Sequence, residues 1–372
     1  MGNSSQVSDK LKLFLLTILV GVGVALTYHI FEAIIHNSID RIWYDWLNTD
    51  THRWVVIPTA IVLTLVYFGV QHFWDRKAEK QESRGLGSMP VPTVINYVKI
   101  LGIGFLSLVA GASLGPEAVL VPACMVLGAY VGTKAYKSQE GMVKSLAMAG
   151  FIALFAAFFH SFIIGLLSVL LVKKQIKIKL DLGVIIIAIL AAGSCALVVS
   201  ALSSPQYFSF PSYSWKLSFE DLILIVLLAI AGAATTYGIG FAYRSFERLK
   251  KFINHKEWWF QALVAAVGIS ALYLMGGQLV EFTGNKSIVP MFEQAAILGF
   301  LGLLWIFVIK VGAIGWSKAM GYRGGMVFPT IFLASVLVAI AQIYFKDANF
   351  IYGLIAALAG AIVADSKVKV LL

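Results

Sequence analysis

Long apolar runs alternate with short polar or charged breaks along the whole chain. The runs cover residues 13–35, 54–74, 95–110, 145–172, 184–202, 222–243, 258–275, 295–316, 331–340 and 350–364. Several approach the ~20 residues that an α-helix needs to cross the hydrocarbon core of a bilayer, while others are too short or are interrupted by Gly or Pro. The pattern predicts an all-α, multi-pass membrane protein in which some helices are broken or re-entrant.

Composition supports this prediction. Of the 372 residues, 59% are hydrophobic and only 13% are charged, and the mean hydropathy is +0.86. A soluble domain cannot hide this much apolar surface, because its helices need a polar face. The net charge of +10 comes from short basic clusters between apolar runs, which is typical of cytoplasmic loops and not of a nucleic-acid-binding protein. We therefore expect a protein of the cell membrane that has lipid, and no nucleic acid, as a partner.

The charges between the runs predict the orientation in the membrane. Basic residues cluster at 75–84, 173–179 and 244–257, and by the positive-inside rule we expect these segments and the N-terminus in the cytoplasm. The aromatic-rich connection 203–220 has a single cation and is expected outside. Near its end, Ser218 and Asp221 have the spacing of a capping box, so a helix should begin there.

Interrupted segments occur on both sides of this connection. We expect a single membrane domain, residues 1–372, with one half at about 11–202, the outer loop at 203–220 and a second half at about 221–372. Irregular backbone at membrane depth is tolerated only where it lines a cavity or is buried in protein. Paired interrupted helices in two halves are the best sequence pointer to a transporter-like site near the middle of the membrane.

One carboxylate stands out in the stretch Gly111-Ala-Ser-Leu-Gly-Pro-Glu-Ala118. Gly115 suits a helix N-cap and Pro116 the first helical position, which would place Glu117 in the first turn, beside unpartnered N–H groups and the positive end of the helix dipole. An acidic group at membrane depth costs about 2.5 to 3.5 kcal/mol on insertion scales, so it needs a reason. Such a place attracts anions, and Glu117 can occupy the anion's position until it is protonated or displaced. The other interpretation is a simple dipole complement, which is common in first turns.

A second stretch, Gly321-Tyr-Arg-Gly-Gly325, also has glycines four residues apart and precedes the apolar run 331–340. Aligning Gly111 with Gly321 places Gly115 on Gly325 and the position of the carboxylate on a valine. One motif therefore carries the charge and the other does not, which favours the functional interpretation.

A third glycine-rich segment, residues 85–92, contains two prolines. Gly87 or Ser88 can cap a short helix that begins near Pro90. Alone, such a segment is usually a loop. Because an apolar run and the Glu117 stretch follow it, it predicts another helix start that points into the membrane.

Other candidate residues have simpler interpretations. Cys124 and Cys195 lie inside apolar runs without a metal-binding spacing, so we interpret them as packing residues and expect no metal or cofactor. A lone histidine such as His160 is more often a hydrogen-bonded structural group than a functional one, and both interpretations stay open. Glu281 and Lys286 are interpreted as solvated loop residues.

An intramembrane enzyme would need clustered catalytic groups. Glu117 and His160 are the only ionisable residues deep in apolar runs that we consider for such a role, and they form no recognised constellation. We therefore expect no enzyme. Convergence of polar side chains would favour catalysis, whereas convergence of helix N-termini would favour anion transport.

The three motifs resemble those of the CLC family of chloride channels and chloride/proton antiporters. Residues 111–118 are similar to its GSLGREGP-type motif, in the form that bacterial members write with Gly-Pro-Glu. Residues 324–329 are similar to its GGxFxP-type motif, and residues 87–90 to its GSGIP motif. Order and spacing agree from about residue 13 to the end of the chain.

The resemblance implies a homodimer with one anion pathway per subunit, built from two inverted halves. Glu117 matches the gating glutamate of the family, and the implied ligand is chloride or another small anion. Backbone N–H groups at helix starts can bind an anion without a full positive charge that would trap it. The family's serine ligand falls on Gly87, with Ser88 the nearest hydroxyl. The implied anion-binding residues are Gly87, Ser88, Gly115, Pro116, Gly325, Met326, Val327 and Phe328.

The chain departs from the family pattern in three places. Pro116 and Ala118 replace residues that are frequently Arg and Gly. The family's antiporters carry a second, internal glutamate near the end of the helix that here would run over residues 156–172, where this chain has leucine, valine and then Lys173. We therefore expect passive or weakly coupled flux, with a proton-coupled or fluoride-selective antiporter as the alternative. Residues 361–372 stop before the family's last helices, which keeps open a truncated or non-transporting membrane scaffold.

Overall fold

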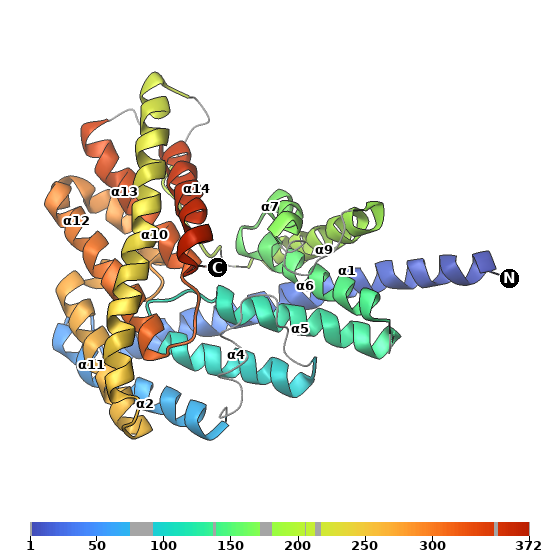
Figure 1. The fold of residues 1–372 in the computed structure, drawn as a ribbon, viewed down its shortest axis with the longest axis horizontal. Helices are drawn as coiled ribbons and strands as arrows, with labels where there is room; N and C mark the ends of the chain where they lie inside the picture. Colours follow the sequence, from blue (N-terminus) through green and yellow to red (C-terminus); the bar gives the residue numbers. More distant parts are fainter. Residues whose placement is uncertain are drawn as a thin grey trace. The chain divides into compact units, whose positions relative to one another are not determined.

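The computed structural model describes residues 2–74, 92–136, 139–171, 181–204, 206–212, 217–345 and 349–371. Every regular element among them is a helix (Figure 1). Ten of these helices are long and apolar enough to cross a membrane. This confirms the predicted all-α, multi-pass class. The chain divides into two compact units, which are described one at a time: unit 1 holds Met1–Asn37, Lys77–Gly102 and Ala118–Tyr207, and unit 2 holds Ser38–Arg76, Ile103–Glu117 and Phe208–Leu372.

Unit 1 is built from helices that approach each other through small residues. Its helices, three of which begin or end in unit 2, are α1 (Gly2–Ile39), α4 (Val94–Val109), α5 (Glu117–Tyr136), α6 (Glu140–Phe158), α7 (Phe162–Leu167) and α9 (Leu182–Ala201). A Cβ atom added to Gly128 would collide with the Leu146 carbonyl, and one added to Gly150 with the Cys124 carbonyl. Close backbone approach of this kind is typical of helix packing in membranes. Cys124 and Cys195 are both buried and unpaired, as expected of packing residues.

Unit 2 holds six of the α-helices that the structure describes. They are α2 (Val56–Trp74), α10 (Phe219–Ile253), α11 (Trp258–Gly276), α12 (Ile288–Met320), α13 (Val327–Tyr344) and α14 (Phe350–Val368). Short 3-10 helices at Arg53–Val55, Gln278–Val280 and Asn285–Ser287 connect them, and α1 continues here as a π-helix, Asp40–Trp46. Helix α10 packs against α14 and α12 (Figure 1), and α11 packs against α2. At the α10–α14 contact, Gly232 meets the Ala357 carbonyl and Gly360 meets the Ala229 carbonyl.

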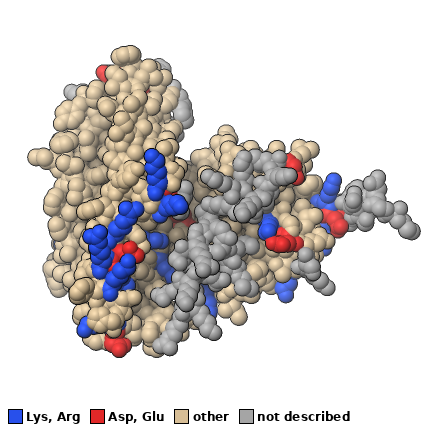
Figure 2. Space-filling model, in the orientation of Figure 1, with Lys and Arg blue, Asp and Glu red and all other residues tan. Residues whose placement is uncertain are grey.

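The outer surface of unit 2 is apolar over large areas. Ile297 is 89% exposed, Phe252 80% and Leu301 76%. Figure 2 shows broad uncharged surfaces, with the visible Lys and Arg side chains gathered in limited groups. A continuous apolar surface of this extent would be costly in water, but a bilayer solvates it.

Two predicted helix boundaries were wrong. The helix expected over residues 156–172 begins six residues late, because α6 ends at Phe158 and α7 begins at Phe162, inside the apolar run 145–172. His160 lies in the break with φ of +46°, and the Ser161 hydroxyl caps α7 by accepting the N–H of Ile164. Hydropathy continues across the break, so the apolar pattern did not indicate it.

The basic segment 244–257 was predicted as a loop, but α10 continues to Ile253. Lys, Arg and Glu are good helix formers, so a helix need not end where it leaves the apolar region. The start of the same helix was predicted correctly. The Ser218 hydroxyl accepts the N–H of Asp221, and the Asp221 carboxylate accepts the N–H of Ser218, which completes the capping box.

Candidate functional site

The two glycine motifs meet in unit 2. Gly115 donates its N–H to the Gly325 carbonyl and Gly325 donates its N–H to the Gly115 carbonyl, each over 2.8 Å. Gly111 and Gly321 have nearly the same backbone, with φ of +98° and +100°. This left-handed conformation ends a helix and is favourable for glycine. The predicted alignment of Gly111 with Gly321 is confirmed by this shared geometry.

Two serines also connect the two glycine motifs in a reciprocal way. The Ser317 hydroxyl accepts the N–H of Ser113 over 3.0 Å, and the Ser107 hydroxyl accepts the N–H of Arg323 over 2.7 Å. Ser107 and Ser317 each lie four residues before the left-handed glycine of their own motif. Each hydroxyl accepts the N–H of the residue that lies two positions after the glycine of the other motif. The two motifs therefore hold each other by a reciprocal set of hydrogen bonds.

Glu117 lies where the motifs meet. It is the first residue of α5 and is 8% exposed. Its Oε1 accepts the N–H of Phe328, in the first turn of α13, over 3.1 Å. Its Oε2 is buried and accepts no hydrogen bond from the described residues. Cβ atoms added to Gly115 or Gly325 would collide with the carboxylate, so a side chain at either position would displace it.

The structure brings most of the predicted site residues together. Met326 is the N-cap of α13, Val327 its first residue, and Phe328 the donor to Glu117. No acidic residue of α13 itself lies in its first turn, so the positive end of that helix faces a carboxylate from another element. Gly87 and Ser88 lie outside the described residues. Helix α5 begins one residue after the predicted first position, Pro116, while the predicted place of Glu117 in its first turn is confirmed.

A cation lies beside this site. The Lys318 ammonium, on α12, is 3.4 Å from the Gly324 carbonyl. It interacts electrostatically with the Glu117 carboxylate. An ammonium in this place favours negative charge in the site, whether that charge belongs to Glu117 or to a bound anion.

Behind the site, the loop between α11 and α12 is tied to the first motif. The Tyr273 hydroxyl donates to the Gly111 carbonyl and accepts the N–H of Phe282, each over 2.8 Å. The Ser113 hydroxyl donates to the Phe282 carbonyl over 3.0 Å, and the Thr283 hydroxyl donates to the Leu114 carbonyl over 2.7 Å. The N–H and the carbonyl of Phe282 therefore connect this loop, through Tyr273 and Ser113, to the segment that leads to Glu117.

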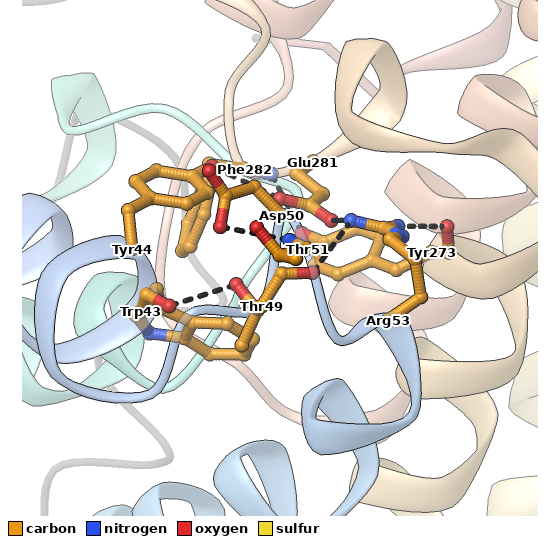
Figure 3. Close-up of polar contacts among 9 residues, drawn as sticks. All are labelled: Trp43, Tyr44, Thr49, Asp50, Thr51, Arg53, Tyr273, Glu281 and Phe282. Carbon is orange, nitrogen blue, oxygen red and sulfur yellow. Dashed lines mark hydrogen bonds and ion pairs between the residues drawn. The ribbon is translucent and has the colours of Figure 1, made fainter.

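The same loop carries a buried ion pair (Figure 3). Glu281 is 2% exposed, and its oxygens accept from Arg53 Nη1 over 2.7 Å and from the Tyr44 hydroxyl over 2.9 Å. Arg53 Nη2 also donates to the Tyr273 carbonyl over 2.9 Å. Burial raises the pKa of Glu281, while Arg53 and Tyr44 act in the opposite direction.

The prediction that Glu281 is solvated was therefore wrong. Its partner Arg53 lies far away along the chain, so no local pattern indicated the pair. The prediction for Lys286 is confirmed, because it is exposed and pairs with Asp40 over 2.9 Å.

Two buried charges inside apolar runs were missed. Lys310, in the middle of α12, is fully buried and donates to the carbonyls of Val280 and Phe282. Glu32, on α1 in unit 1, is 1% exposed and lies 3.4 Å from Nδ1 of His36. Glu117 and His160 are thus not the only ionisable residues within apolar runs. The signal was present, because a charge inside a run long enough to span a membrane is a functional candidate by default.

The chain is similar to known transport proteins over most of its length. The family model described as Voltage gated chloride channel matches residues 75–365. A candidate ion-transport protein named YfeO, from Salmonella choleraesuis strain SC-B67, is 26% identical over 300 residues, which are 77% of this chain and 69% of the relative. The YfeO protein of Salmonella typhimurium has the same identity and coverage.

Solved structures share the fold. The crystal structure of a CLC-type fluoride/proton antiporter has a TM-score of 0.69 at 17% identity and covers 96% of this chain and 87% of its own. A slow cyanobacterial Cl⁻/H⁺ antiporter has a TM-score of 0.69 at 14% identity and covers 95% and 94%. Such low identities show the fold alone. The family model, in contrast, spans well over half of the chain, so this protein belongs to the CLC family of voltage gated chloride channels.

Proposed function

We propose that this protein carries chloride or a similar small anion across the membrane through a site at the start of α13, and that Glu117 is the gate of this pathway. The family consists of channels and transporters, so the protein is not an enzyme. What is specific to the proposal is the anion, the site and the role of the carboxylate.

One observation carries the proposal: the Glu117 carboxylate accepts the N–H of Phe328 at the start of α13. The N-terminus of a helix is a ready-made anion site, because its first N–H groups lack partners and the dipole favours negative charge. A buried carboxylate that uses such a donor competes with a free anion for it. Protonation removes the charge of the carboxylate, weakens its hold on the donor and lets the anion enter.

The surroundings support binding that is also reversible. Gly115 and Gly325 expose backbone close to the carboxylate, and Pro116, Met326 and Val327 complete the two helix starts. Donors of this kind are partial charges, and conduction requires sites that release the ion as well as bind it. Lys318 adds one full charge at the edge of the site.

The test is chloride efflux from liposomes that contain the purified protein, measured at several pH values. The parent should conduct faster as the pH falls, and Glu117→Gln, which is permanently neutral, should conduct at a rate that does not depend on pH. Glu140→Gln is the matched control, because Glu140 is an exposed carboxylate paired only with Lys144. A folded parent without flux, or a Glu117→Gln variant that keeps the full pH dependence, would contradict the proposal.

We also propose that the flux is passive or weakly coupled to protons. The chain has Leu170, Leu171, Val172 and Lys173 where the resemblance places a second, proton-relaying glutamate. Liposomes with a chloride or a fluoride gradient and a proton-sensitive dye test this. Uphill proton movement driven by either anion would contradict passive flux. Faster flux of fluoride than of chloride would change the proposed anion.

The assembly is a further part of the proposal. We infer a homodimer in the cell membrane, surrounded by lipid, with the N-terminus in the cytoplasm. Lys and Arg cluster in segments 75–84, 173–179 and 244–257, and by the positive-inside rule this clustering supports the orientation. Labelling of single cysteines introduced at Lys10 and at Gln206 in intact cells tests the orientation, and the mass of the detergent-solubilised protein tests the dimer.

A further inference from the structure

Lys310 is the buried cation of unit 2 that the proposed pathway does not use. It is fully buried in the middle of α12 and forms no ion pair with any residue that the structure describes. The nearby Glu281 carboxylate is occupied by Arg53 and Tyr44. A lone buried ammonium is costly in a protein interior and more so at membrane depth. Its position therefore needs a physical reason.

The contacts of the ammonium lead to the gate segment. Lys310 Nζ donates to the Val280 carbonyl over 3.0 Å and to the Phe282 carbonyl. The Phe282 carbonyl also accepts the Ser113 hydroxyl. Ser113 lies four residues before Glu117. One carbonyl oxygen thus joins the lysine to the segment from which the gate carboxylate extends.

Helix α12 holds this segment at two points. Lys310 and Ser317 are seven residues apart, about two helical turns, so they lie on one face of α12. The Ser317 hydroxyl accepts the N–H of Ser113, while Lys310 holds the carbonyl to which the Ser113 hydroxyl donates. The backbone and the side chain of Ser113 are therefore both fixed from the same helix face.

The ammonium also lies beside α13. Its Nζ is 5.4 Å from the centre of the Phe332 ring, a cation–π distance. A Cβ added to Gly284 would collide with the same ring, so the loop and α13 are in contact here. Lys310 therefore contacts both the loop that holds Ser113 and the helix whose first turn holds the Glu117 carboxylate.

We propose that Lys310 is a positioning residue of the gate, whose ammonium fixes the Phe282 carbonyl against Ser113 and so sets where Glu117 meets the N–H of Phe328. The inference rests on the proposed role of Glu117. Hydrogen bonds from a charged donor are about twice as strong as neutral ones, which gives a reason for a lysine where an amide could also reach the carbonyls.

The test compares Lys310→Met, which removes donors and charge, with Lys310→Arg, which keeps both. The readout is the ratio of chloride flux at acid pH to flux at neutral pH in liposomes. We expect Lys310→Met to reduce this ratio about tenfold or more, because losing a charged hydrogen bond has an effect of that order on the occupancy of the held position. Lys310→Arg should restore a large part of the ratio, and Lys286→Met, at an exposed lysine, should not change it.

A double variant separates positioning from general damage. In a Glu117→Gln background the gate is already neutral, so Lys310→Met should change the ratio no further. An additional change there, or an unchanged ratio in the single variant, would overturn the inference. Should Lys310→Met fail to fold, Ser113→Ala carries the same test, because it removes only the hydroxyl that shares the Phe282 carbonyl.

The two proposals fail differently. A parent without pH-dependent flux would reject the role of Glu117 itself. A parent with a pH dependence that Glu117→Gln abolishes, together with Lys310→Met and Ser113→Ala profiles like the parent, would reject only the role of Lys310.

Discussion

Gly115 and Gly325 donate their backbone N–H groups to each other's carbonyl oxygens over 2.8 Å in both directions. This exchange joins the start of α5 to the start of α13 without any side chain. The Glu117 carboxylate fills the space that side chains would take at these two positions. The pairing therefore creates the space for the Glu117 carboxylate, the proposed gate, and places it within 3.1 Å of the N of Phe328.

The first prediction concerns that space. In Gly325→Ala, the added Cβ would collide with Oε1, Cδ and Cγ of Glu117. Overpacking of this kind costs about 1–3 kcal/mol, so we expect a lower free energy of unfolding in detergent and a carboxylate pushed off the N–H of Phe328. Flux at neutral pH should rise toward the acid value.

The collision between the added Cβ and the Glu117 carboxylate can be tested by removing the carboxylate. Glu117→Ala should recover most of the stability that Gly325→Ala loses, since the two atoms in conflict are then no longer both present. Gly141→Ala is the control, because no atom lies near the position of its Cβ. Additive losses in the double variant would show that the alanine destabilises by another route.

The second prediction compares the two left-handed glycines. An L-residue in this conformation costs about 1–2 kcal/mol, so Gly111→Ala and Gly321→Ala should both destabilise. Gly111 should be the more sensitive, because its Cβ would lie 3.2 Å from the Trp43 ring, whereas the nearest atom at Gly321 is the mobile end of Lys250 at 4.0 Å. Thermal unfolding of both variants checks the order, and equal losses would show that backbone strain alone decides.

Much of the fold was predictable because hydropathy reports where a helix can be buried in lipid. The runs that became α2, α9 and α11 had nearly correct ends, whereas the run 331–340 was four residues short of α13 at each end. The run 145–172 did not, because its break depends on the conformation of His160 and on a cap from Ser161, and neither changes the hydropathy. Composition and the periodicity of apolar positions predict that a helix forms, whereas a break of this kind depends on single residues.

Some features of the candidate site were predictable from the sequence and others were not. Glu117 and the register of the glycine motifs were visible, because small residues and a lone charge at fixed spacing are local signals. The environments of Glu281 and Lys310 were not, because their partners lie far away in the chain: Arg53 for the first, and the carbonyls of Val280 and Phe282 for the second. Side-chain burial of a loop residue depends on tertiary contacts, which no local pattern reports.

The third prediction uses the reciprocal serines. Ser317→Ala leaves the buried N–H of Ser113 without its acceptor, and Ser107→Ala does the same to the N–H of Arg323. An unsatisfied buried donor costs about 1–3 kcal/mol, so both variants should lose stability, and Ser107→Ala should lose less because Arg323 is only half-buried. Ser335→Ala is the control, since its hydroxyl bonds only to the Ile331 carbonyl one turn earlier in its own helix. A loss confined to one of the two serines would contradict the reciprocity of the motifs.

The fourth prediction concerns the hydroxyl of Tyr273, which bonds on one side to the Gly111 carbonyl and on the other to the N–H of Phe282. Tyr273→Phe keeps the ring and removes both bonds at once. Each buried group left unsatisfied costs about 1–3 kcal/mol, so the melting temperature in detergent should fall by several degrees. Tyr237→Phe is the matched control, because Tyr237 is 53% exposed on α10.

The same variant should also change transport, because the hydroxyl connects the loop at Phe282 to the segment that leads to Glu117. We expect Tyr273→Phe to reduce the pH dependence of flux in the same direction as Lys310→Met, and by a smaller factor, since a neutral hydrogen bond contributes less than one made by an ammonium. Chloride efflux at acid and neutral pH measures both. Lower stability with an unchanged pH profile would show that the loop supports the fold without setting the position of the gate.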